Sequence, residues 1–384
     1  SGRVATQQTC GPIQLPLNNV SVMALDFTSN KGIATGIGHA PGAALVDPVA
    51  GSKLAIAEAL LNIIWAPLTY GLKGVSLSAN WMWPAKNAGE NARLYSAVEA
   101  VSDFACKLGI NIPTGKDSLS MTQKYPGGEV VYSPGTVIIS AVGEVSNIRQ
   151  TVSPALEPIV GSKLIYIDFS KDSFKLGGSS FAQIVNQLGT EAPSITDEAY
   201  FVKAFEAVQH LINQNLILAG HDISAGGLIT TLLEMCFPTP GVGMNIHISE
   251  LGSDLIKVLF AENSGIVLQV EDVPSVVKIL TVNGVKSALL GEVTNTRVLS
   301  IDKFQMTIDK LRTTWFHTSY LLDKIQRPKG HAEKRKENLF KQVLEYKFPT
   351  RFDGKFSTYG IDPKRRKATG IKAAIIREKG VNGD

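Results

Sequence analysis

The stretch LILAGHDISAGGLITTLLEM places a histidine, a carboxylate and a hydroxyl at a corner between two apolar runs, as His221, Asp222 and Ser224. Gly226 and Gly227 follow at once, and an apolar, helix-like pattern then begins. Glycines let a ligand come close to the backbone, and free N–H groups at a helix start attract anions. Because Asp222 is itself an anion, a phosphate beside it would need a metal ion between them. The corner therefore indicates a magnesium–nucleotide phosphate site, with an Asx or Ser cap on the helix as the plainer alternative.

A second candidate lies in the run LAIAEALLNIIWA, in which Glu58 and Asn62 are the only polar residues. Apolar side chains cover every face of this helix, so it should be buried on most sides. The i, i+4 spacing puts Glu58 and Asn62 on one face. A buried carboxylate needs a partner, which would be either a lysine or arginine from elsewhere in the fold or a divalent cation. The oxygen ligands of this pair suit magnesium rather than zinc.

Three other features carry weaker signals. The sequence LGGSS at 176–180 is a second glycine corner with the same two interpretations. The segment TGKDSLSM sets Lys116 and Asp117 in a predicted turn, which would hold a phosphate or form a salt-bridged turn. The Gly-rich GIATGIGHAPG matches neither the dinucleotide-binding fingerprint nor the P-loop, so neither fold is predicted.

The elements that must position these side chains begin with an α/β unit over residues 1–155. The residue pattern predicts a strand over 20–27, a long Gly-rich loop over 30–48, and a helix over 52–66 that Pro67 ends. Further elements are a strand within 74–81, a helix over 92–109 closed by Gly109, and a strand over 135–145. Two prolines near residue 155 indicate a domain boundary.

A second α/β unit is predicted over residues 156–310. It should open with a buried strand over 162–170 and continue with the glycine corner and its helix. The remaining elements are a helix over 197–215, the HDIS corner and its helix, a strand and helix within 264–280, and a strand at 290–295. Alternation of this kind predicts a layered α/β or α+β architecture for both units. Residues 311–384 should form a charged helix and a basic linker.

Composition limits the class of protein. The chain has 384 residues, 44% of them hydrophobic and 19% charged, with a formal net charge of +4. Much of the positive excess lies near the C-terminus and is better explained by a solvated helix and linker than by nucleic-acid binding. Cys10, Cys106 and Cys236 are far apart, and the last two lie in apolar helical patterns, which predicts core residues and a reducing compartment. No run of 18 apolar residues and no signal pattern is present, so we expect a cytoplasmic chain without a membrane partner.

Taken together, these motifs resemble one family in their order and spacing. The resemblance rests on QQTCGPIQLPLNNVSVMAL, LAIAEALLNI, LSANWMWPA, IPTGKDSLSM, VSPAL, LGGSSFAQ and GHDISAGGL, and it covers essentially the whole chain. The family is the large form of phosphoribosylformylglycinamidine synthase, which holds two copies of an aminoimidazole-ribonucleotide-synthetase-like domain pair followed by a glutaminase. This chain resembles the second copy, and its ending TGIKAAIIREKGVNGD resembles the first strand of the glutaminase.

The resemblance implies an N-terminal sheet domain that dimerises and a C-terminal layered α/β domain. In the family, ATP activates the amide oxygen of formylglycinamide ribonucleotide, and ammonia from glutamine then displaces phosphate to give the amidine. The second copy carries an auxiliary site for a structural magnesium–ADP. By motif, Glu58, Asn62 and Asp222 would be metal ligands, with Ser224 and Asn18 near the nucleotide. Gly226, Gly227 and Lys116 would complete the nucleotide contacts.

One position departs from the family. An aspartate is expected just before the first strand, where this chain has Asn19. Replacing a carboxylate by an amide removes one negative charge from the metal cluster, so fewer magnesium ions or a weaker site would follow.

Two functional hypotheses result. The chain is part of an ATP-dependent amidoligase, or it is a non-catalytic nucleotide-binding scaffold that docks the other domains of the enzyme. A selenophosphate synthetase is disfavoured because Cys10 stands without a nearby lysine. We expect a homodimer, because a lone copy would leave the pairing face of its first domain uncovered.

Overall fold

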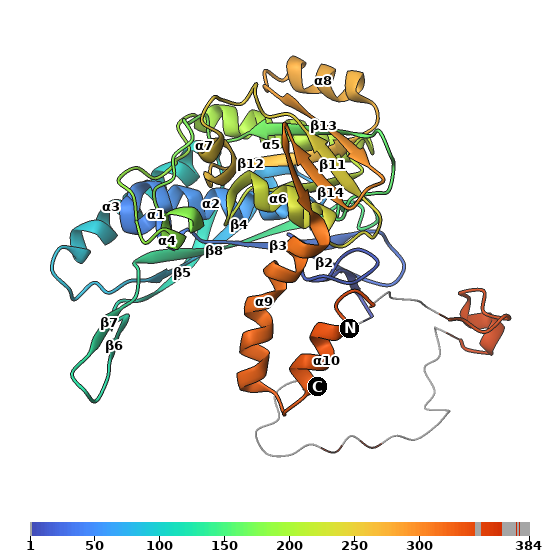
Figure 1. The fold of residues 1–384 in the computed structure, drawn as a ribbon, viewed down its shortest axis with the longest axis horizontal. Coiled ribbons are helices and arrows are strands. Elements are labelled where there is room, and N and C mark those ends of the chain that lie inside the picture. Colours follow the sequence, from blue (N-terminus) through green and yellow to red (C-terminus); the bar gives the residue numbers. More distant parts are fainter. Residues whose placement is uncertain (1, 342–346, 363–373, 375, 377–384) are drawn as a thin grey trace. The chain divides into compact units, whose positions relative to one another are not determined.

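The computed structural model describes residues 2–341, 347–362, 374 and 376 of the chain, which divides into a compact unit, Ser1–Val343, and a smaller one, Leu344–Asp384. The larger unit contains two main sheets and the helices that cover them (Figure 1). The α/β architecture expected from the sequence is confirmed, with one sheet in each half of the unit.

The first sheet has six strands and is antiparallel except for one pair, β4 and β5. In spatial order its strands are β1 (Val4–Thr6), β2 (Ser21–Ala24), β3 (Gly32–Gly38), β8 (Thr136–Val145), β4 (Ser76–Met82) and β5 (Asn111–Ser118). Its helices are α1 (Pro41–Val46), α2 (Pro48–Ile63), the short η1 (Gly71–Gly74) and α3 (Glu90–Leu108). Strands β6 (Thr122–Lys124) and β7 (Val130–Tyr132) form a separate hairpin.

The Gly-rich segment is not the long loop that the sequence suggested. It contains β3, which lies between β2 and β8 inside the sheet. A Cβ atom at Gly38 would lie 2.2 Å from both Ala55 O and Ala59 N of α2, and one at Gly36 would lie 2.8 Å from Ala59 O. The glycines therefore serve close packing of strand on helix rather than a flexible turn. Residues 114–121, predicted as a turn, lie largely in strand β5 as well.

The predicted helices agree with the structure more closely than the predicted loop and turn do. Helix α2 begins at Pro48, earlier than predicted, because the Asp47 side chain accepts hydrogen bonds from the N–H groups of Val49 and Ala50. Almost every apolar position of α2 is buried, as expected from its all-round hydrophobicity. Helix α3 ends at Gly109, whose φ of +72° confirms the predicted glycine cap.

The second sheet has seven strands. In spatial order they are β10 (Ala219–Asp222), β12 (Gly265–Val270), β9 (Lys163–Asp168), β13 (Ala288–Thr294), β11 (Gly243–Ile246), β14 (Val298–Ile301) and β15 (Phe304–Thr307). The helices of this half are α4 (Ser180–Ile184), α5 (Glu198–Asn213), α6 (Gly227–Cys236), α7 (Leu255–Phe260), α8 (Val273–Val282), α9 (Ile308–Gln326) and α10 (His331–Glu337).

The two halves share one hydrophobic core. Helix α5 of the second half packs toward the end of α2, where the buried Gln209 donates to Ile64 O and Ala66 O and accepts from Leu68 N. Val152 and Leu156, next to the predicted boundary, are buried as well. The second core cluster lies on the opposite side of the second sheet, against α6, α7 and α9.

The cysteine predictions hold in part. Cys10 and Cys236 are buried, but Cys106 is exposed on α3, so its assignment to the core was wrong. An apolar local pattern does not decide which face of a helix turns to the core.

The charged C-terminal helix predicted from the sequence corresponds to α9 and α10. Asp323 accepts from Arg327 at 3.0 Å and from Arg335 at 2.6 Å, which ties the two helices together. In the smaller unit, η2 (Phe356–Tyr359) follows the stacked rings of Phe348 and Phe352. The predicted start of a glutaminase strand, at residues 369–384, lies almost wholly outside the described residues. Among the helices that the structure describes, none is long and apolar enough to cross a membrane.

Candidate functional site

Helix α2 carries the predicted pair Glu58 and Asn62 toward the second half of the molecule. Asn62 Nδ2 donates to Ile37 O of β3 at 2.8 Å, so its amide oxygen points away from the strand and stays available. The two side chains line neighbouring cavities. Glu58 lines one pocket, and Asn62 lines a more open groove.

The first cavity, called the Glu58 pocket below, has a volume of about 310 Å³. It lies where the start of α1, helix α2 and both glycine corners meet. Its lining includes His39, Gly42, Glu58, Gly177, Gly178, Ser180, Ser224 and Glu262. The LGGSS corner and the HDIS corner, far apart in the sequence, therefore face one cavity, and the predicted residues Glu58 and Ser224 share it.

Glu262 joins the two corners. Its Oε1 accepts from the backbone N–H of Gly226 at 2.7 Å and from that of Ser180 at 2.8 Å. The Gly227 N–H donates to Ser224 O at 3.1 Å. The expectation that the glycine pair leaves free N–H groups for a phosphate is therefore wrong. A carboxylate of the chain already takes the anion position at the start of α6.

The capping interpretation is correct for the LGGSS corner and not for the HDIS corner. Ser179 caps α4, accepting from Ala182 N at 3.2 Å, so the plainer interpretation of the LGGSS corner is confirmed. The N-cap residue of α6 is Gly226, which has no side chain with which to cap the helix. Ser224 therefore does not cap α6 and instead lines the Glu58 pocket.

The Glu58 pocket is electrostatically negative. Burial and the nearby carboxylates of Asp222 and Glu262 raise the pKa of Glu58 well above its ordinary value. His221 opposes this effect. A pocket in which carboxylates crowd one another favours a cation, which would relieve their repulsion.

Asp222 ends strand β10 and is held from one side by His221. Asp222 is 2% exposed, and its Oδ1 lies 3.3 Å from His221 Nδ1. His221 Nε2 lies 3.1 Å from Glu234 Oε2 on α6. Burial alone would lower the pKa of His221, but hydrogen bonds to Asp222 and Glu234 raise it to about 10. Both ring nitrogens therefore donate, and the imidazolium partly offsets the local negative charge.

The second cavity, called the Asn62 groove below, contains the predicted residues Asn18, Asn19 and Asn62. Asn18 Nδ2 donates to Gln7 O and Thr9 O, which fixes its side chain. Asn19 Nδ2 is buried and has no acceptor among the described residues. Because amide O and N atoms are assigned from their partners, the reversed orientation would offer Asn19 Oδ1 at this point instead.

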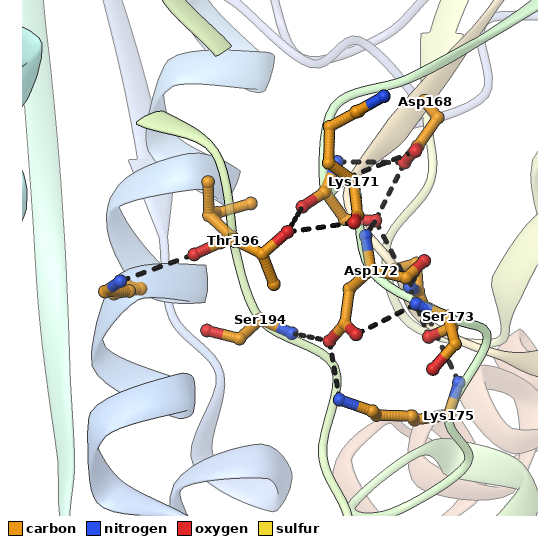
Figure 2. A network of polar contacts seen from close by, with 11 residues as sticks. Asp168, Lys171, Asp172, Ser173, Lys175, Ser194 and Thr196 are labelled. Atoms are coloured by element: carbon orange, nitrogen blue, oxygen red, sulfur yellow. Dashed lines mark hydrogen bonds and ion pairs between the residues drawn. The ribbon is translucent and has the colours of Figure 1, made fainter. Parts of the chain in front are cut away.

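A polar network holds the LGGSS corner in place (Figure 2). Asp172 Oδ2 accepts from Lys175 Nζ at 2.8 Å and from Ser194 N at 3.1 Å, linking the segments on either side of the corner. Thr196 Oγ1 donates to Lys171 O at 2.8 Å within the same network. Lys53 of α2 adds a bond to Ile195 O at 3.3 Å. The corner is therefore fixed to α2, which carries Glu58.

Lys116 lies elsewhere. It is exposed on β5, donates to Ser118 Oγ at 2.7 Å, and lines neither the Glu58 pocket nor the Asn62 groove.

The sequence analysis did not identify Glu262 and Glu234 as site residues. The signal for Glu262 was its place in AENSG, a polar stretch between an apolar helix and an apolar strand. Glu234 gave no such signal, because it is one acidic residue on an amphipathic helix.

The donor set can be compared with the needs of magnesium. Glu58, Asp222 and the Asn62 amide supply hard oxygen atoms, which this ion prefers. Among the described residues, no group of three or more His, Cys, Asp or Glu side chains could hold a metal ion. Magnesium commonly keeps waters and phosphate oxygens in its coordination sphere, so a site with few protein ligands still fits it. The residues therefore fit a magnesium ion shared with a phosphate, and not an all-protein metal site.

Two family profiles match the chain. A phosphoribosylformylglycinamidine synthase profile, the FGAR-AT PurM_N-like domain, matches residues 1–144. The C-terminal domain of AIR-synthase-related proteins matches residues 160–303. The two matches correspond to the two sheets.

Curated relatives match over the full chain. The probable phosphoribosylformylglycinamidine synthase of Arabidopsis thaliana, described as chloroplastic/mitochondrial, is 38% identical, and the probable enzyme of Caenorhabditis elegans is 37% identical. The phosphoribosylformylglycinamidine synthase of Homo sapiens is 36% identical. Each match covers 100% of this chain but only 27%, 30% and 29% of the respective relative. The chain thus spans less than a third of these proteins.

Solved structures share the fold. T. maritima PurL complexed with FGAR aligns with a TM-score of 0.61 and 14% identity, covering 77% of this chain and 48% of that one. T. maritima PurL complexed with ADP aligns with a TM-score of 0.58 and 13% identity, covering 78% and 47%. At this identity the likeness concerns the fold alone.

Proposed function

Because this chain belongs to the phosphoribosylformylglycinamidine synthase family, we propose that its Glu58 pocket binds a magnesium–nucleotide complex. The observation that carries the proposal is the meeting of Glu58, Ser224 and both glycine corners around one cavity of about 310 Å³. Nucleotides are also the ligands named for T. maritima PurL, which is described in complexes with ATP, ADP and AMPPCP.

The charge of the pocket supports a metal-bound ligand over a free anion. Glu58 and Glu262 both line the cavity, and Asp222 acts on Glu58 from close by. A bare polyphosphate would be repelled by these carboxylates. A magnesium ion held by Glu58, Asp222 and the Asn62 amide would neutralise both sides and bridge protein to phosphate. Asn18 and Asn19 would border the magnesium ion and its nucleotide on the side of the adjoining Asn62 groove.

At the level of the whole protein, we place the chain in the ATP-dependent ligase that makes formylglycinamidine ribonucleotide in purine biosynthesis. The chain would form the half with an auxiliary, structural magnesium–ADP. Since the relatives are more than three times as long, the remaining domains would supply the other parts of the reaction. The second hypothesis, a nucleotide-binding scaffold without its own turnover, is compatible with this proposal, because it describes the role of this part of the enzyme alone. We also propose a cytoplasmic location for this protein. The Arabidopsis relative, by contrast, is described as chloroplastic/mitochondrial.

The binding proposal is tested on the purified chain. The protein is denatured and removed, and the released small molecules are identified by mass spectrometry, with magnesium counted by atomic emission. The expected result is near-stoichiometric ADP with magnesium, or uptake of both when they are added. Glu58→Ala should abolish this binding, whereas Glu271→Ala, an exposed acidic residue outside the pocket lining, should retain it. Absence of nucleotide together with absence of uptake would contradict the proposal.

The exposed face of the first sheet supports a protein partner. Met23, Ile33, Ile37 and Val142 lie on adjacent strands and point away from α2, with exposures of 39–58%. An apolar sheet face of this kind needs a cover. We propose that it pairs with a second copy of this chain in isolation, and with the first synthetase-like half in the complete enzyme.

Light scattering tests this pairing. The chain should behave as a dimer, and Val142→Glu should convert it to a monomer because it places a charge in the apolar face. Val282→Glu, at a residue exposed on α8, is the matched control and should leave the dimer unchanged. A monomeric wild-type chain would contradict the pairing.

A further inference from the structure

A line of polar contacts runs from helix α9 to Asp222. Trp315 Nε1 on α9 donates to Glu234 Oε1 at 2.9 Å. Glu234 Oε2 lies 3.1 Å from His221 Nε2, and His221 Nδ1 lies 3.3 Å from Asp222 Oδ1. Each side chain uses a different atom for each neighbour, so the four form an unbroken chain from α9 through α6 to β10.

Three members of this chain are restrained by their surroundings. Asp222 and His221 are 2% and 6% exposed. The Trp315 ring packs against the fully buried ring of Phe237, with the ring centroids 5.6 Å apart. The Thr231 hydroxyl donates to Asp222 O at 2.9 Å, fixing the backbone that carries the carboxylate. With its backbone fixed, Asp222 depends on His221 for the rotation of its side chain.

Among the four residues in this line of contacts, Glu234 is the one to which the site description gives no other role. It occupies a polar position on α6, and its two oxygens face two separate donors, the Trp315 indole and the His221 imidazole. A carboxylate is the one side chain of this length that accepts at both ends. Glu234, His221 and Trp315 all line the Asn62 groove, so three of the four members lie beside the proposed ligands Asn19 and Asn62.

We propose that Glu234 and Trp315 are positioning residues that orient His221 and, through it, the Asp222 carboxylate toward a divalent cation. This inference deepens the proposed magnesium–nucleotide site and rests on it for the identity of the ion. Partners behind a metal ligand restrict its rotation, and their loss commonly weakens metal binding by roughly 10-fold to 100-fold. A ligand on β10 would thereby depend on a residue of α9, the helix that follows the second sheet.

The chain offers a matched control for this idea. Trp83 Nε1 donates to Glu90 Oε2 at 2.8 Å, which is the same indole–carboxylate bond at almost the same length. Trp83 and Glu90 line neither the Glu58 pocket nor the Asn62 groove. Trp83→Phe and Glu90→Gln therefore remove the same chemistry as Trp315→Phe and Glu234→Gln at a place unrelated to Asp222.

The first measurement follows the His221 side chain by ¹H–¹⁵N spectroscopy of protein labelled with ¹⁵N-histidine, with its signals assigned by their loss in His221→Asn. In wild-type protein the Nε2–H that faces Glu234 should be visible and slow to exchange. Trp315→Phe and Glu234→Gln should shift the Nε2–H signal and accelerate its exchange, whereas Trp83→Phe and Glu90→Gln should not. An unchanged His221 signal in Trp315→Phe and Glu234→Gln would overturn the inference, whatever the protein binds.

The second measurement uses Mn²⁺ with ADP, followed by electron paramagnetic resonance of the ion. Glu234→Gln should weaken Mn²⁺ binding by roughly 10-fold or more and Trp315→Phe by less, because Trp315 acts one contact further away, with both control variants at the wild-type affinity. Equal affinity in all five proteins would overturn the inference. If wild-type protein binds no Mn²⁺–ADP, the proposed function fails, and the His221 spectra still decide whether the positioning chain exists.

Discussion

The Glu262 carboxylate accepts a hydrogen bond from the backbone N–H of Gly226 at 2.7 Å, at the start of helix α6. The same oxygen accepts from Ser180 N at 2.8 Å. One side chain thus occupies the anion position that the glycine motifs had suggested for a phosphate. It also joins two corners that are 46 residues apart in the sequence, counted from Ser180 to Gly226.

Glu262→Ala should therefore both destabilise the fold and admit an anion. Two backbone N–H groups lose their acceptor, which costs about 1 to 3 kcal/mol for a buried group. With the carboxylate removed, inorganic phosphate becomes a possible acceptor for both groups. In a thermal melt without metal, phosphate should raise the melting temperature of Glu262→Ala more than that of wild-type protein. A phosphate effect of equal size in both proteins would refute this role, and Glu271→Ala serves as the control for loss of one negative charge.

Wild-type protein should bind ADP only in the presence of a divalent cation. The carboxylates of Glu58 and Glu262 line the pocket, and the N–H groups of Gly226 and Ser180 are already bonded to Glu262. No attraction for a bare phosphate then remains to offset the repulsion. Isothermal titration with ADP should give binding with Mg²⁺ and none in excess chelator. Equal affinity under both conditions would show that the metal is not the bridge.

The sequence was most informative where a pattern is local. Glu58 and Asn62 stood out because polar residues are rare in so apolar a helix, and Gly109 marked the end of α3. Strand β3 was missed because glycine usually marks loops. Its Gly32, Gly36 and Gly38 recur at even spacing with Ile33, Thr35 and Ile37 between them. That alternation was a strand signal, and the close packing of α2 on the strand explains Gly36 and Gly38.

Residues that act across the fold could not be predicted in the same way. Glu262 reaches two corners from a third segment, and Glu234 depends on a histidine and a tryptophan that other elements bring to it. Such partners are set by how sheets and helices pack, which no local spacing records. The sequence indicated an anion at the glycine corner, and the anion that the structure has there is the Glu262 carboxylate. The sequence could not tell that the anion belongs to the protein.

The fit between β3 and α2 gives a further prediction. A Cβ atom on Gly38 would lie 2.2 Å from Ala55 O and Ala59 N and 2.8 Å from Glu58 Cβ. Gly38→Ala must therefore push α2 away from the sheet, at a cost of about 1 to 3 kcal/mol or more. Urea unfolding should show this loss, and nucleotide binding should weaken because Glu58 moves. Gly127→Ala, where no atom lies within 4 Å of the new methyl group, is the control and should change the free energy of unfolding little. Equal stability of the two variants would contradict the close packing.

The last prediction concerns the carboxylate that joins the two halves of the larger unit. Glu198, at the start of α5, lies 3.0 Å from Lys53 Nζ of α2 and 3.1 Å from Lys107 Nζ of α3. Burial alone would raise the pKa of Glu198, but hydrogen bonds from its own backbone N–H, Lys53 and Lys107 lower it from 4.5 to about 2. The folded state therefore holds this proton less tightly than the unfolded chain does. The resulting stabilisation is complete above pH 4.5 and is lost as the pH falls toward 2.

Glu198→Gln should accordingly lower the free energy of unfolding at pH 7 by about 1 to 3 kcal/mol, the upper end being reduced by solvent near Lys107. Urea unfolding at pH 7 and at pH 3 measures the difference between wild type and variant. This difference should shrink at the lower pH because the unfolded wild-type chain takes up a proton at Glu198 below pH 4.5, whereas the folded protein does so only near pH 2. Lys107→Met, which leaves the Lys53 bond in place, should cost less than Glu198→Gln. A difference between wild type and Glu198→Gln that stays constant from pH 7 to pH 3 would mean that the charge on Glu198 contributes nothing, and that its hydrogen bonds alone join α5 to α2 and α3.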